Sequence, residues 1–248
     1  MPTYQAPRAD EDRLTSLEAA RDTGAKDRAA NRPSITQETL DALTAFVPIF
    51  RPLYEALAGA LSGRMKEVRE REEARAVLDT HVRDFWEVLK RRAHRLPHPA
   101  EILALFGLPT DGTAPNPTTF DQLVQWADAI VKGDADAVAA GYPAMANPSA
   151  AEVAAVLATA RLQAADVPSA DRAYVDAQMA IAAQRPRADE LIADVMADLR
   201  SSLRRLDDPT QRRIMRTYGA TILALPGDRS IPFRHRHPRK PTRDRCVD

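Results

Sequence analysis

The chain has 248 residues, and its 35 Lys and Arg residues balance 35 Asp and Glu residues, so the formal net charge is zero. This balance excludes a uniformly basic nucleic-acid binder and an acidic solvating chain, and the 44% of hydrophobic residues excludes disorder along the whole length. The 45 alanines, against 9 glycines and 13 aromatic residues, favour helices over strands because alanine has the highest helix propensity. The composition therefore predicts an all-α protein.

Two further features narrow the class of protein. The segment 1–10 lacks the apolar core of a signal peptide, and the longest stretch nearly free of polar groups, 42–50, is far shorter than the roughly 20 residues that span a bilayer. The single cysteine, Cys246, permits no intrachain disulfide and no thiolate metal cluster, but leaves an intermolecular disulfide open. We therefore expect a soluble, cytoplasmic protein with no membrane partner.

The chain begins with a polar arm, residues 1–32, whose six basic and six acidic side chains predict at most a weak or transient helix. A first helical repeat, 33–107, follows. Its opening helix meets Pro48 and Pro52, which we expect to break or kink it because proline has no amide hydrogen to donate. The repeat closes with a short helix that ends at Gly107, a residue type suited to the left-handed position beyond a helix.

The long segment of this repeat, 53–95, carries apolar residues at helical spacing, which predicts one buried stripe. The stripe consists of Leu53, Leu57, Leu61, Met65, Val68, Leu78, Val82, Phe85 and Leu89. The charged run 69–75 lies within it and is expected to form solvated, local ion pairs.

A connecting segment, 108–147, opens with a turn-rich loop. An amphipathic helix is expected from about Thr118, with Gly133 as its end. Its apolar face consists of Phe120, Leu123, Val124, Ala127, Ile130 and Val131. This segment is long enough to cross a helical bundle and connect two copies of a hairpin.

A second helical repeat, 148–227, resembles the first. Matching landmarks follow in the same order, 110 to 116 residues apart: Ser34 and Ser149, Pro52 and Pro168, Leu89 and Leu203, Pro99 and Pro209, and Phe106 and Tyr218. Pro168 should break this copy as Pro52 does the first, and Pro186 should kink or split its long helix. We therefore predict an elongated helical bundle built from two tandem copies, with a core like that of a four-helix bundle.

Short motifs in the two copies carry a family resemblance. They are Leu53-Tyr54-Glu55, Val82-Arg83-Asp84, and the endings Phe106-Gly107 and Tyr218-Gly219. On these motifs the chain resembles a bacterial family of duplicated helical-hairpin proteins. The resemblance implies an architecture and no catalytic activity.

Candidate metal and catalytic residues lack the surroundings that such chemistry needs. His94 and His98 have a spacing that suits zinc on a helix, but Pro97 lies between them, so a solvated helix end is expected. Asp134 and Asp136 lack the glycine and glutamate of a calcium loop. A polar cluster is interpreted as a helix start favoured by the helix dipole; it consists of Asp171, Arg172, Tyr174 and Asp176. The sequence therefore predicts no catalytic, metal or cofactor site and no small-molecule ligand.

The C-terminal segment 228–248 is expected to be a basic, disordered tail. Between positions 229 and 245 it carries seven basic residues against one acidic residue; the basic ones are Arg229, Arg234, Arg236, Arg239, Lys240, Arg243 and Arg245. These residues are candidates for contact with a polyanion or a partner protein. The tail is equally compatible with docking on a neighbouring subunit and with no role.

The expected function follows from these observations. A duplicated bundle with no convergent polar constellation predicts a non-enzymatic helical scaffold that acts by self-association or partner binding. The alternative is a nucleic-acid-associated protein that uses the basic tail.

Overall fold

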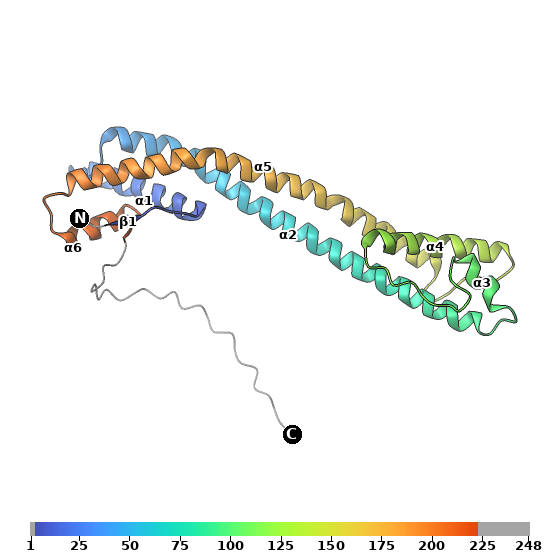
Figure 1. Cartoon of the computed structure of the whole chain (residues 1–248). Helices are drawn as coiled ribbons and strands as arrows, with labels where there is room; N and C mark the ends of the chain where they lie inside the picture. The colour runs from blue at the N-terminus through green and yellow to red at the C-terminus, as the bar shows by residue number, and fades with distance from the viewer. Residues whose placement is uncertain (1–2, 223–248) are drawn as a thin grey trace, which may run out of the picture. The chain divides into compact units, whose positions relative to one another are not determined.

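The computed structural model describes residues 3–222 and confirms the all-α prediction (Figure 1). Its elements in chain order are β1 (Tyr4–Gln5), α1 (Asp10–Ala29), α2 (Gln37–Ala93), α3 (Pro99–Leu105), α4 (Phe120–Ala139), α5 (Ala150–Ser202), α6 (Asp208–Thr217) and β2 (Thr221–Ile222). The two short strands pair antiparallel, with Tyr4 opposite Ile222. Within the described part of the chain, no helix is both long enough and apolar enough to cross a membrane.

The described residues form two compact units. Unit 1 holds residues 3–43 and 191–222, and unit 2 holds residues 44–190. Unit 1 therefore combines two segments that are far apart in the sequence, whereas unit 2 is one continuous segment. The boundaries expected for tandem repeats differ from these units and stay a prediction.

The proline residues do not break the long helices, so the expected breaks are wrong, while a kink at these residues stays a prediction. Pro48 and Pro52 lie inside α2, and Pro168 and Pro186 lie inside α5, each of which is one continuous helix. All four side chains are exposed. The proline rings therefore lie on the exposed side of each helix, where water can replace a lost backbone hydrogen bond.

In unit 1, α1 packs against α6 and forms part of the core. Its residues Leu14, Leu17 and Ala20 are buried, so the N-terminal segment contains a packed 20-residue helix rather than only a polar arm. Gly219 has φ 83°, as expected for a left-handed residue beyond a helix. A side chain there would also meet Ser16, whose Cα would lie 2.7 Å from an added Cβ.

In unit 2, α3 and α4 cover the end of α2 around an aromatic cluster. Trp86 packs edge-on against both Phe106 and Trp126, at centroid distances of 6.3 and 6.1 Å. The helix α4 starts where the sequence predicts, with Thr119 in a capping box, but it continues past Gly133 to Ala139. Gly133 is buried against Phe106, so it permits close packing and does not end the helix.

Candidate interaction surface

One part of unit 2 consists, within the described residues, mainly of two helices, which the α4 region contacts at one end through Arg75 with Thr118 and Arg161 with Asp128. We call this part the arm and define it as residues 51–77 of α2 and 161–180 of α5. Figure 1 shows the two helices antiparallel and side by side along this stretch. No α2 residue of the arm is buried, and Val167 is the only buried residue on the α5 side. The arm therefore has little core of its own.

The polar contacts between the two helices of the arm centre on Arg64. The Arg64 guanidinium donates to the Asp171 carboxylate and lies over the ring of Tyr174, with Cζ 5.6 Å from the ring centroid. The hydrogen bond with Asp171 raises the pKa of Arg64 above its ordinary value. These contacts position one helix relative to the other, and they bury little apolar area.

The seam between the helices does not follow the predicted apolar stripe. The α2 residues that face α5 alternate in steps of three and four, and all are half-buried or buried: Leu57, Ala60, Arg64, Glu67, Arg71, Ala74 and Leu78. Leu61 and Met65 instead continue from Leu57 in steps of four. Each such step turns the side chain about 40° beyond a full turn, so these residues leave the seam. Leu61 is 39% exposed and Met65 65% exposed, which corrects the prediction that they are buried.

The two edges of the seam have different characters. Along one edge runs an open groove of about 360 Å³ with mainly small or charged side chains. Its lining is Ala60, Gly63, Arg64, Glu67, Asp166, Ser169, Ala170 and Ala173. The groove therefore offers neither a deep pocket nor large apolar side chains.

The other edge of the seam is apolar. On α2, Leu61, Met65 and Val68 lie one residue further round the helix than Ala60, Arg64 and Glu67, which places them on the opposite side of the seam from the groove. On α5, the same helical geometry places Pro168, Val175 and Met179 on this side; Val175 is 48% exposed and Met179 60%. We call these six residues the apolar face. Exposed apolar side chains gathered in this way are typical of protein interaction sites.

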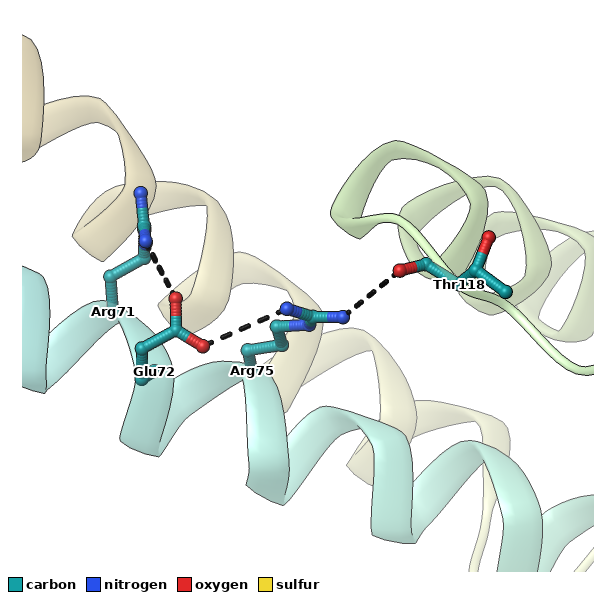
Figure 2. Close-up of polar contacts among 4 residues, drawn as sticks. All are labelled: Arg71, Glu72, Arg75 and Thr118. Carbon is teal, nitrogen blue, oxygen red and sulfur yellow. Dashed lines mark hydrogen bonds and ion pairs between the residues drawn. The ribbon is translucent and has the colours of Figure 1, made fainter.

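The charged run of α2 forms the local ion pairs that the sequence predicts. Lys66 pairs with Glu70, and Arg69 with Glu73, at 3.4 and 3.7 Å. Figure 2 shows the next set, in which Glu72 lies between Arg71 and Arg75. Arg75 also donates to the Thr118 carbonyl oxygen at 3.3 Å, so it connects α2 to the residue just before the capping box of α4.

The sequence did not reveal a second polar cluster, which lies in unit 1. The Asp198 carboxylate oxygen Oδ2 accepts hydrogen bonds from the Thr36 amide, the Thr36 hydroxyl and the Thr39 hydroxyl, at 2.8 to 2.9 Å. Thr36 immediately precedes α2 and Thr39 lies in its first turn, so the cluster holds the start of that helix to α5. Because Asp198 is distant in sequence from Thr36 and Thr39, no local sequence pattern predicts this cluster.

The acidic and aromatic residues that the sequence analysis weighed as candidate site residues make ordinary structural contacts. Asp171 and Tyr174 lie in the middle of α5, so their interpretation as a helix start is wrong, and they pair with α2 instead. Asp134 accepts a hydrogen bond from the Met145 amide, and Asp136 pairs with Lys132. In residues 3–222, His, Cys, Asp and Glu form no group of three able to hold a metal ion. The seven basic tail residues lie outside the described residues.

Comparison of the chain with protein-family models, curated proteins and solved structures gives no match. Among the features described above, the apolar face is the one whose chemistry points to a binding event.

Proposed function

We propose that the protein is a non-enzymatic helical scaffold that acts through its surfaces, by binding further copies of itself or another protein. The observation that carries this proposal is the apolar face of the arm. Water contact with large apolar side chains costs free energy roughly in proportion to their area, and covering them recovers it. A helical protein with such a face gains stability when a second protein surface covers it.

Photo-crosslinking in living cells tests this function. A chain with p-benzoylphenylalanine in place of Met65 should form a covalent adduct with whichever protein covers the face. Leu162 is the control position, because it is also exposed but points away from the α2–α5 seam. Adducts at 65 and none at 162 are expected; equal adducts, or none at either position, contradict the proposal.

The finer architecture that we propose is a duplication, and the order of elements supports it. A 20-residue helix, a long helix with two internal prolines and a short helix occur as α1–α2–α3 and again as α4–α5–α6. Left-handed residues follow the first helix of each set, at Asn31 and Gly141, and the last, at Gly107 and Gly219. The copy proposed here thus includes the helix that precedes each expected repeat.

If the chain is duplicated in this way, the two compact units contain equivalent helical segments. Unit 1 contains the first helix and the start of the long helix from one copy, with the end of the long helix and the short helix from the other. Unit 2 contains the complementary parts. Each unit would then be a bundle of four helical segments, whereas the sequence predicts a single four-helix-like core shared by the two copies.

A second candidate function is nucleic-acid binding through the tail, favoured by its seven basic residues against one acidic residue between positions 229 and 245. Such binding would be electrostatic and would weaken steeply with salt. A chain that ends at residue 228 should lose retention on DNA or RNA at low salt. Unchanged retention, or no retention of the full chain, contradicts this candidate.

A further inference from the structure

We infer that the apolar face of the arm is covered by the same face of a second copy of this chain, so that two arms form a four-helix bundle. This inference rests on the proposed scaffold function and names the partner and the surface. Four features of the arm support it: its internal symmetry, its area, its charge and its small core.

Four of the six residues of the apolar face form two pairs of large apolar side chains when the two proposed copies are aligned. At the spacing of 114 residues that relates Leu89 to Leu203, Leu61 matches Val175 and Met65 matches Met179. All four side chains are exposed. Both copies have thus kept two large apolar side chains at positions with no partner in the described chain. A surface with matching halves suits the isologous contact of a twofold dimer, in which both subunits use the same patch.

The area of the arm fits a stable dimer. Residues 51–77 of α2 extend about 40 Å at 1.5 Å per residue, and two adjacent helices are about 20 Å wide. Residues 161–180 of α5 extend about 30 Å, so one face of the arm covers about 700 Å², close to the roughly 800 Å² that each partner contributes to a standard protein interface. Face-to-face contact would bury this area without any change in either helix.

The charge of the arm permits a second copy to approach. Its two segments carry eight basic and eight acidic residues, so two arms meet without net repulsion. The remaining exposed charges of α2, such as Lys66 and Arg69, are already paired within the helix. The arm has no net charge that would attract a strongly charged partner. A second neutral arm can approach it without net repulsion.

A second arm would also supply the missing core. Four-helix bundles bury apolar residues from all four helices in one seam, while the arm alone buries only Val167. Two-helix segments with polar seam residues such as Arg64 and Glu67 are weakly stabilised, because polar residues at seam positions reduce stability. Pairing places Leu61, Met65 and their matches on α5 between the two layers.

Sedimentation velocity of the full chain between 1 and 100 µM, in 0.5 M NaCl, tests this inference. High salt screens contacts made by the basic tail and leaves apolar contacts in place. We expect a dimer, and we expect the double variant Met65→Glu, Met179→Glu to raise the dimer dissociation constant at least tenfold. The variants Leu162→Glu and Met65→Leu are the controls and should change it less than threefold. Circular dichroism checks that every variant keeps its helix content.

The outcomes separate this inference from the broader function. A monomer at every concentration overturns the inference, while crosslinks from position 65 to another protein would still support a scaffold. A dimer that the Met65→Glu, Met179→Glu variant leaves unchanged places self-association on another surface and also overturns the inference. Loss of the dimer in that variant, with both controls intact, supports it.

Discussion

Tyr218 buries a hydroxyl group in unit 1 and satisfies it with a carboxylate. Its side chain is fully buried, and its Oη donates to Asp27 Oδ2 at 2.8 Å. Burial, together with this hydrogen bond, raises the pKa of Tyr218 to about 12, from an ordinary value of 10.0. Because the folded state raises the pKa, the stabilisation is complete below pH 10 and is lost as the pH rises towards 12.

The expected result is that the Tyr218→Phe variant loses about 1 kcal/mol of unfolding free energy at pH 8, the usual contribution of one hydrogen bond. The wild-type protein should lose more stability than the variant between pH 9 and 11. Urea denaturation of both proteins at pH 9 and pH 11 measures this difference in the loss of stability. Parallel pH dependence of the two proteins would show that Tyr218 does not titrate in this way.

Gly133 and Gly63 test whether helix packing or helix propensity dominates at a glycine. At Gly133 an added Cβ would lie 2.4 Å from Phe106 Cδ1 and 2.9 Å from its Cα, whereas at Gly63 it would meet nothing within 4 Å. We expect Gly133→Ala to destabilise unit 2 by about 1–3 kcal/mol through overpacking. Gly63→Ala should stabilise by about 0.5–1 kcal/mol, because alanine loses less backbone entropy. Chemical denaturation of both variants checks the opposite signs.

Some features of the helices can be predicted from local sequence patterns, and others depend on tertiary contacts. Local signals placed the start of α4 near Thr118 and the left-handed residues Gly107 and Gly219, because caps and glycine ends depend on residues a few positions apart. Pro52 and Pro168 do not break their helices, because water can replace the lost hydrogen bond of a proline on the exposed side of a helix. Leu61 and Met65 leave the predicted apolar stripe because two successive steps of four residues rotate their side chains out of the seam.

The start of α2 depends on an acceptor from α5, and this dependence gives a prediction. The variant Asp198→Ala removes the acceptor of three hydrogen bonds from Thr36 and Thr39. We expect it to cost about 1.5–3 kcal/mol, the range for hydrogen bonds to charged groups. Hydrogen exchange should become faster first in the initial turns of α2. Exchange that increases uniformly over unit 1, or not at all, would contradict a local role.

At the scale of the whole molecule, parts of the same helix belong to different compact units. The sequence predicts the helices and their repetition, but it has no signal that assigns the start and the end of α2 to different compact units. The apolar face was likewise hidden, since Leu61 and Met65 look like core residues until the position of α5 is known. The candidate site therefore became visible only when the structure separated the seam residues from their neighbours.

The interleaving of the chain leads to a last prediction. Each unit contains residues from both sides of the loop 108–117, because unit 1 takes its segments from the two ends of the chain and unit 2 spans the loop. A chain cut by a protease at a site inserted after Thr110 should therefore remain one particle in native buffer. The two pieces would be held in unit 1 by contacts such as Asp198 with Thr36 and Tyr218 with Asp27, and in unit 2 by Arg64 with Asp171. Size-exclusion chromatography should release separate fragments only in denaturant. Separation in native buffer would mean that each half folds by itself in sequence order.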